Sequence, residues 1–375
     1  MTRRILLLTL LLCLFMSATS LLYSQTVVGG HVKMVLSDYK SGKSDGKKGS
    51  ESAGMALREF DIYISQEIND RISVETATEF SVSTSATPGF GKPIKGEKNM
   101  PSDVTESFSG WREFKVKLNL PKGYELTTGI LHPEWTWEYG AEKFWEEEIN
   151  GSKFALNTDI SALHETGFEV YRNFELEYMS LPVYLWITNG HSVANDNNNT
   201  FDIGLKLQPE LGAVKFEGGI WTGKWDDEAQ KSHIRWIAGV DYTAGKFNLR
   251  SEIGSARISK SVAIKDTSGA VVRYGDSEPF GYIIKGFYHV KPWCKVMLAY
   301  DYLKKDNSGG GPGEETYKTI IPGLIFDFSP SAHLIVQGTI ADWKRIREPA
   351  LLSSAAAREN KLKFDRIVVG WRITF

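Results

Sequence analysis

The stretch "FDRIVVGWRITF" (residues 364–375) decides the fold, because apolar residues alternate along it with polar or small ones. Successive residues of an extended strand point to opposite faces. One face carries Ile367, Val369, Trp371, Ile373 and Phe375, and the other carries Arg366, Gly370, Arg372 and Thr374. An apolar strand face that runs to an aromatic last residue indicates a surrounding solvent that tolerates exposed hydrocarbon.

The beginning of the sequence predicts a secretory signal peptide. Two arginines precede an apolar run at 5–16, and small residues follow it. The run is shorter than the roughly 20 residues that a membrane-spanning helix needs. Cleavage after Ser20 or after Ser24 fits the small residues, and the later site is favoured. We therefore expect a signal peptide over residues 1–24 and one domain over residues 25–375.

Charge and cysteine content exclude several classes of protein. The 44 basic and 46 acidic residues give a net charge of −2, which becomes −4 once the two arginines of the signal peptide are removed. This balance is too mild to indicate a nucleic-acid partner. Beyond the signal peptide only Cys294 remains, so we expect no disulfide framework and no cysteine-based zinc site. The seven histidines lack metal-ligand spacing, and we expect no metal and no cofactor.

Alternating segments recur along the whole chain and predict about 16 strands, each near the 9–11 residues of a tilted membrane strand. In "TFDIGLKLQ" (200–208), for example, every second residue is apolar. The expected strands lie near 27–36, 57–66, 71–82, 111–120, 124–132, 167–178, 181–188, 200–208, 212–221, 233–243, 246–254, 280–290, 293–302, 316–327, 332–341 and 364–375.

The connections between these strands alternate in length, which separates two kinds of all-β fold. The short ones lie at 68–70, 121–123, 179–180, 209–212, 244–245, 291–292 and 329–331. The long ones lie at 37–56, 83–110, 133–166, 189–199, 222–232, 255–279, 303–315 and 342–363. A soluble sandwich also alternates apolar and polar residues, but it has no reason to keep this rhythm. The rhythm predicts a transmembrane antiparallel up-and-down β-barrel with short periplasmic turns and long external loops.

The expected lipid surroundings require the barrel to close. Lipid offers no hydrogen bonds, so every backbone N–H and C=O must find a partner within the protein. A sheet achieves this only without edges. We therefore expect the last strand to pair with the first, near "TVVGGHVKMVL" (26–36), and the protein to be integral to the outer membrane after export through the periplasm.

The signal peptide, the strand rhythm and the last strand together resemble the bacterial outer-membrane porins, general or phosphate-selective. Gly370, Trp371, Ile373 and Phe375 resemble the terminal signal that the outer-membrane insertion machinery recognises. "LWITNG" followed by "NNNTFDIGLKLQPELG" resembles the middle of the phosphate-selective members, with Asn189, Gly190 and Lys206 as matching positions. The basic ladder of those members is missing, so phosphate is not carried over. The resemblance implies a homotrimer.

The third long connection, "HPEWTWEYGAEKFWEEEING" (132–151), is unusually aromatic and acidic. In the porins that the chain resembles, this loop folds inward and narrows the pore. The resemblance therefore implies a constriction favouring cations or sugars, built from Glu134, Trp135, Trp137, Glu138, Tyr139, Glu142, Trp145, Glu146, Glu147 and Glu148. An aromatic girdle at the membrane surface is the main alternative, and a specific ligand site is another.

Charged residues of both signs are expected to face the lumen. The basic candidates are Lys115, Lys117, Lys206, Lys215, Arg235, Arg250, Lys295, Lys318, Arg366 and Arg372. The acidic candidates are Glu59, Asp61, Glu113, Glu175, Glu177, Asp202, Glu217, Asp241, Glu252 and Asp301. A ring of one sign selects ions of the other, and similar numbers of both leave the ion preference open. Many of these groups are expected to pair across neighbouring strands.

Passive diffusion of small polar solutes or ions through a water-filled barrel is the function that the sequence favours. The protein is then not an enzyme. A barrel hydrolase needs a nucleophile beside a base, and although His233 or His289 could serve as the base, no serine in a recognisable context accompanies them. A structural or adhesive barrel without an open channel is the remaining alternative. Plugged transporters have about 22 strands, more than this chain predicts.

Overall fold

A computed structural model describes residues 25–41, 51–80, 109–140, 147, 152–161, 164–190, 200–224, 231–265, 271–306, 313–329, 331–347 and 358–374. The expected signal peptide (1–24), Phe375 and the loop residues Glu142, Trp145, Glu146 and Glu148 lie outside these ranges. None of the helices in the described ranges is long and apolar enough to cross a membrane.

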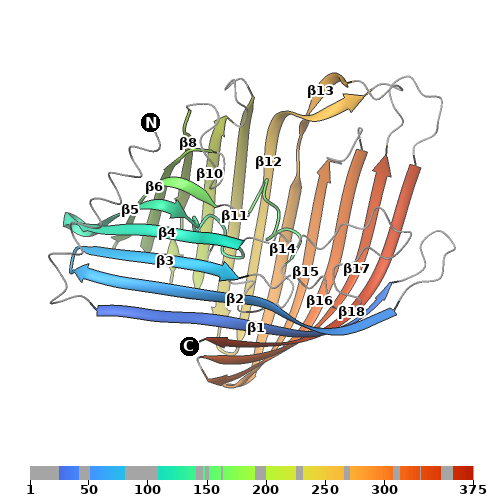
Figure 1. The fold of residues 1–375 in the computed structure, drawn as a ribbon, viewed down its shortest axis with the longest axis horizontal. Coiled ribbons are helices and arrows are strands. Elements are labelled where there is room, and N and C mark those ends of the chain that lie inside the picture. The colour runs from blue at the N-terminus through green and yellow to red at the C-terminus, as the bar shows by residue number, and fades with distance from the viewer. Residues whose placement is uncertain are drawn as a thin grey trace.

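The described chain forms one sheet of 18 antiparallel strand segments (Figure 1). The segments are β1 (Gln25–Ser41), β2 (Glu51–Asn69), β3 (Ile72–Phe80), β4 (Ser109–Leu120), β5 (Tyr124–Leu131), β6 (Glu165–Glu175), β7 (Ser180–Thr188), β8 (Asp202–Leu207), β9 (Glu210–Leu211), β10 (Val214–Lys224), β11 (Ser232–Ala244), β12 (Phe247–Lys265), β13 (Val271–Ser277), β14 (Phe280–Lys291), β15 (Cys294–Asp306), β16 (Gly313–Ser329), β17 (Ala332–Arg347) and β18 (Arg358–Thr374). The prediction of an all-β, up-and-down barrel is confirmed.

The barrel closes through the pairing of β1 with β18. Met34 lies opposite Trp371 in this pair, and β1 pairs on its other side with β2. The predicted contact between the last strand and the first is therefore confirmed. We call a strand of the barrel wall a stave, whether it is one segment or two segments in line. Among the described strands each stave has two neighbours, so the sheet keeps no open edge of unpaired backbone groups.

Two staves are broken, each beside a proline. β8 and β9 both pair with β7 and with β10, and Pro209 separates them. β13 and β14 both pair with β12, and Pro279 separates them. Proline has no N–H for the ladder, which explains breaks at these positions. Counted as continuous staves, the 18 described segments form the sixteen that the sequence predicts.

The two ends of the barrel differ in the length of their connections. Tight turns join β2 to β3, β4 to β5 through the 3-10 turn η2 (Pro121–Gly123), β6 to β7, β9 to β10, β11 to β12, β14 to β15 and β16 to β17. The other connections leave the opposite end. These long connections are shorter than expected where strands continue past their predicted ends. The predicted loop 255–279 is the main error, because β12 continues to Lys265 and pairs there with β13.

Exposure along the strands separates an outer face from an inner face. On β8, Ile203 and Leu205 are 51% and 41% exposed, whereas Asp202 and Lys206 are 1% and 0% exposed. The apolar residues therefore face outward and the polar residues face inward. Large outward aromatics collect near the short turns, including Tyr178, Trp293 and Phe328. Such a belt is typical of a membrane–water interface.

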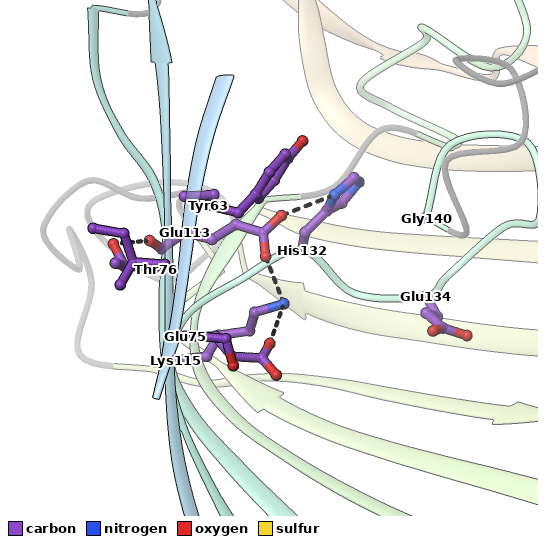
Figure 2. Close-up of a pocket in the computed structure, with 11 residues that line it drawn as sticks. Tyr63, Glu75, Thr76, Glu113, Lys115, His132, Glu134 and Gly140 are labelled. Carbon is purple, nitrogen blue, oxygen red and sulfur yellow. Dashed lines mark hydrogen bonds and ion pairs between the residues drawn. The ribbon is translucent and has the colours of Figure 1, made fainter. Parts of the chain in front are cut away.

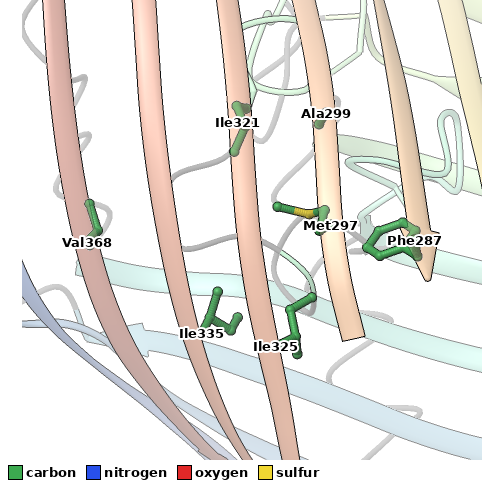
Figure 3. Close-up of a cluster of buried hydrophobic side chains, with 7 residues drawn as sticks. All are labelled: Phe287, Met297, Ala299, Ile321, Ile325, Ile335 and Val368. Atoms are coloured by element: carbon green, nitrogen blue, oxygen red, sulfur yellow. The ribbon is translucent and has the colours of Figure 1, made fainter. Parts of the chain in front are cut away.

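The inner face of β14–β18 departs from this pattern. A buried apolar cluster lies there, formed by Phe287, Met297, Ala299, Ile321, Ile325, Ile335 and Val368 (Figure 3). These residues alternate with outward apolar residues such as Leu298 and Ile320. Both faces of this wall are therefore apolar, and simple alternation does not tell them apart.

Candidate functional site: the third long connection inside the barrel

The third long connection, from His132 to Ser161 in its described parts, lies inside the barrel (Figure 1). Apart from the contact of His132 with β4, the contacts described below are made with inward-facing side chains of the strands from β7 to β15. Five groups of contacts fix it there: an aromatic anchor, backbone N–H groups held by carboxylates, a buried ion-pair network, a buried lysine of β8 and a histidine pair at its neck.

Trp135 is the aromatic anchor. Its side chain is fully buried, with ring centroids 6.3 Å from Trp186 and 5.7 Å from Trp221 in edge-to-face arrangements. Its Nε1 donates a hydrogen bond of 2.8 Å to the carbonyl of Ile160, which ties the two arms of the loop together. The ring lies over Gly219 of β10, where an added Cβ would come within 2.6 Å of it. The wall therefore makes room for the loop at a glycine.

Two wall carboxylates hold the loop backbone. Glu252 on β12 accepts hydrogen bonds from the N–H groups of Trp137 at 2.7 Å and Glu138 at 2.8 Å. Asp301 on β15 accepts from the N–H groups of Lys153 at 2.6 Å and Phe154 at 3.2 Å. A carboxylate that accepts two backbone N–H groups fixes both the position and the direction of a chain segment.

A buried ion-pair network joins the loop to β12 and β14. Lys285 Nζ lies 2.5 Å from Glu138 and 3.3 Å from Glu147. Arg250 lies 2.8 Å from Glu147 and 3.5 Å from Glu138. Burial opposes ionisation of Glu147, but the charges of Arg250 and Lys285 outweigh burial and hold the pKa of this carboxyl below its usual value. The network thus brings two loop acids onto two wall bases.

A further lysine supports the loop from β8. Lys206 Nζ donates to the carbonyl of Glu134 at 2.5 Å and pairs with Glu217 at 2.8 Å, and both charged side chains are fully buried. The Glu134 carboxylate accepts a hydrogen bond of 3.1 Å from the hydroxyl of Tyr184. Lys206 is one of the positions that resemble the phosphate-selective porins, and here it is covered by the loop.

Two stacked histidines form the neck of the loop. His132 and His164 lie at its two ends, with ring centroids 4.4 Å apart. The hydroxyl of Tyr139 lies 3.2 Å from Nδ1 of His164. His132 Nδ1 lies 3.4 Å from Glu113 on β4. The neck therefore contacts β4, which lies outside the β7–β15 wall that holds the rest of the loop.

A cleft of about 360 Å³ remains beside the loop, between it and the wall formed by β2, β3 and β4 (Figure 2). Its charged and polar lining comes from Tyr63, Ser65, Glu75, Thr76, Glu113, Lys115, His132 and Glu134. Lys115 lies 2.5 Å from Glu113 and 3.9 Å from Glu75. The cleft is partly open to solvent and carries three glutamates against one lysine, which makes its lining acidic.

The residues predicted for a constriction separate into different groups. Glu134 lines the cleft, whereas Trp135 and Glu138 are buried against the wall on the other side of the loop. Trp137, Tyr139 and Glu147 are partly buried in the loop. Glu142, Trp145, Glu146 and Glu148 lie outside the described residues. Whether these residues narrow a working pore stays a prediction.

The basic residues predicted to face the lumen fall into two groups, one covered by the loop and one partly exposed. On inward positions the structure places Lys115, Lys117, Lys206, Lys215, Arg235, Arg250, Lys295, Arg366 and Arg372. The loop covers Lys206, Arg235 and Arg250, and Arg235 donates to the carbonyl of Thr158 at 3.2 Å. The side chains of Lys115, Lys117, Lys215 and Lys295 stay partly exposed and pair with Glu113, Glu125, Glu210 and Asp327.

Two lumen assignments are wrong and two lie outside the description. Lys318 is exposed between the inward, buried residues Tyr317 and Thr319, so it faces outward. Glu177 lies in the turn between β6 and β7 rather than on a strand. The side chains of Glu59 and Asp61 are not among those described.

Residues that contact or form the loop and that the sequence did not single out are the glycines beneath it and the second histidine of its neck. Gly254 lies under Ile160 and Gly281 under Phe154, where an added Cβ would come within 2.7 Å and 2.9 Å of these side chains. No local signal marks them, because a glycine on a strand has many uses. Within the described residues, no group of three His, Cys, Asp or Glu side chains is placed to hold a metal.

Comparison with known proteins finds likeness in structure. The anion-selective porin from Comamonas acidovorans superposes with a TM-score of 0.60 at 13% identity, over 94% of this chain and 100% of that chain. OmpF from Salmonella typhi, in complex with daunomycin, gives 0.56 at 13% identity over 93% and 97%. OmpT, an outer membrane protein of Vibrio cholerae in a trimer form, gives 0.54 at 12% identity over 94% and 99%.

No protein-family model and no curated protein sequence matches the chain. At 12–13% identity the structural likeness establishes the fold. The chain therefore has the porin-like β-barrel fold of bacterial outer-membrane porins.

Proposed function

We propose that this protein is an outer-membrane channel through which small polar solutes or ions diffuse passively. The observation that carries the proposal is the cleft beside the inward-folded loop, which has an acidic lining and is partly open to solvent. No covalent chemistry takes place. The barrel supplies the path, and the width and fixed charge of the cleft supply selectivity.

The cleft favours cations. Of its lining residues Glu75 keeps its side chain 46% exposed, and Glu134 is exposed on the loop. The basic groups Lys206, Arg250 and Lys285 lie under the loop, paired with carboxylates. Because these positive charges are neutralised and covered, they contribute little to the potential along the open path. The acidic lining then makes the electrostatic potential along the path negative.

The membrane location rests on the exposed apolar outer face and the aromatic belt. Gly370, Trp371 and Ile373 lie in the last five residues of β18, which ends at Thr374, and with Phe375 they are the proposed signal for the insertion machinery. The likeness to OmpT of Vibrio cholerae, seen in a trimer form, supports a homotrimer for this chain.

The test uses the mature chain refolded and inserted into planar bilayers under a KCl gradient. Ohmic single-channel openings, with a reversal potential towards that of potassium, are the expected result. The variant Glu75→Gln/Glu134→Gln is expected to move the reversal potential towards zero without loss of openings. A reversal potential towards that of chloride in the parent protein would overturn the cation preference. Absence of openings from a folded barrel would favour the structural or adhesive alternative.

A further inference from the structure

Arg172 on β6 faces outward, on the apolar surface of the barrel. Its neighbours Glu169 and Tyr171 face inward, because Glu169 accepts from Trp186 Nε1 at 2.6 Å and Tyr171 packs on Tyr184. Strand alternation then turns Arg172 to the opposite face with Phe174. A charged side chain on a lipid-facing surface is costly and is usually functional.

Two aromatic rings hold the guanidinium of Arg172. Its Cζ lies 4.4 Å from the ring centroid of Tyr124 on β5 and 4.4 Å from that of Phe174. Its Nε is buried and has no hydrogen-bond partner, and among the described residues no carboxylate pairs with the guanidinium. The rings therefore fix the plane of the guanidinium through cation–π contacts, while its Nε keeps a hydrogen-bond donor that no described residue uses.

The depth of Arg172 in the membrane follows from its neighbours. Tyr124 is the first residue of β5 and follows the tight turn η2, and the register places it opposite Arg172. Tyr178, in the turn after β6, is 82% exposed. Arg172 therefore lies at the short-turn end, in the aromatic belt, where the head groups of the periplasmic leaflet begin.

We propose that Arg172, held between Tyr124 and Phe174, binds the phosphate of a phospholipid in the periplasmic leaflet. The planar fork of arginine matches phosphate oxygens in pairs. The two rings pack against the acyl–glycerol region that accompanies such a phosphate, which a free phosphate lacks. The inference rests on the proposed membrane location and is independent of channel activity.

The test is native mass spectrometry of the full mature chain, refolded in detergent and titrated with phosphatidylglycerol or with the phosphate-free lipid monogalactosyldiacylglycerol. The parent protein is expected to retain phosphatidylglycerol preferentially. Arg172→Gln is expected to weaken this binding about tenfold, near the lower end of what a charge-assisted hydrogen bond contributes. Arg172→Lys is expected to recover part of the binding, because the charge stays and the fork is lost.

Lys215→Gln is the matched control, since it removes one positive charge at the same end of the barrel but from the inner face, where Lys215 pairs with Glu210. It is expected to bind phosphatidylglycerol as the parent does. Equal binding by the parent and by Arg172→Gln would overturn the proposal, as would a change in oligomeric state without a change in lipid binding. Conductance of the same preparations tests the channel proposal separately.

Discussion

Lys285 on β14 and Glu138 on the third long connection form an ion pair of 2.5 Å in which both side chains are fully buried. A buried charge needs a partner of opposite sign, because removal from water is costly. The pair therefore joins the loop to the barrel wall more firmly than a surface contact could, and it directs the loop away from the β2–β4 wall.

Replacing Lys285 by methionine is expected to lower the free energy of unfolding by about 3 kcal/mol, since it leaves Glu138 buried with Arg250 as its one remaining basic partner among the described residues. The loop should also become mobile, which makes single-channel currents larger or noisier. Denaturant titration followed by tryptophan fluorescence, together with bilayer recordings, measures both effects.

The control for this change is Lys117→Met. Lys117 pairs with Glu125 at 2.6 Å, but the two side chains are 37% and 33% exposed. Exposed pairs contribute less than about 1 kcal/mol. An equal loss of stability in both variants would mean that the Lys285–Glu138 pair does not anchor the loop.

The attachment of the loop is expected to weaken in acid. The pKa of Glu147 is held below the ordinary carboxyl value of 4.5 by Arg250 and Lys285, against the opposing effect of burial. Stabilisation by this group is therefore fully present above pH 4.5 and is lost as the pH falls through the lowered pKa. Current noise recorded from pH 7 downward should rise only below pH 4.5.

The variant Glu147→Gln provides the comparison for that pH series. It should show raised current noise already at neutral pH and a smaller further increase in acid, because the ionised form is never present. If the acid-induced noise of Glu147→Gln matched that of the parent protein, another group would control the loop.

Gly219 and its neighbour Gly218 give a paired test of the aromatic anchor. A Cβ at Gly219 would come within 2.6 Å of the Trp135 ring, whereas a Cβ at Gly218 would meet nothing within 4 Å. Gly219→Ala is expected to cost about 1–3 kcal/mol through overpacking. Gly218→Ala should leave stability unchanged or slightly raised. Equal denaturation midpoints for the two variants would contradict the position of Trp135.

Much of the barrel could be predicted from the sequence because the signal for a strand is local. Alternation along 200–208 and 233–243 requires only neighbouring residues to be read, and tight turns such as 121–123 mark where staves reverse. Closure followed from the needs of the backbone in lipid. Lys318 was misplaced because "TIIPGLIF" (319–326) is apolar on both faces, so alternation does not identify the inner one.

The position of the third connection could not be derived from local signals. Its acids looked free to line a pore, but Glu138 and Glu147 are bound to Arg250 and Lys285, which are more than a hundred residues away. The contacts that fix the position of the loop are long-range. Some of them depend on glycines such as Gly219, where the missing side chain leaves space for a loop residue. The resemblance to porins predicted that the loop folds inward. Only the structure identifies the strands of the barrel wall against which the loop packs.

The central claim is that the loop covers the β7–β15 wall and leaves the passage along β2–β4. Cysteine modification during single-channel recording tests this directly, in a Cys294→Ser background. Glu75 lines the cleft with its side chain 46% exposed, whereas Thr188 on the inner face of β7 is 1% exposed. A bulky thiol reagent should reduce the current through Glu75→Cys and leave the current through Thr188→Cys unchanged. Block at Thr188→Cys with no effect at Glu75→Cys would contradict the account.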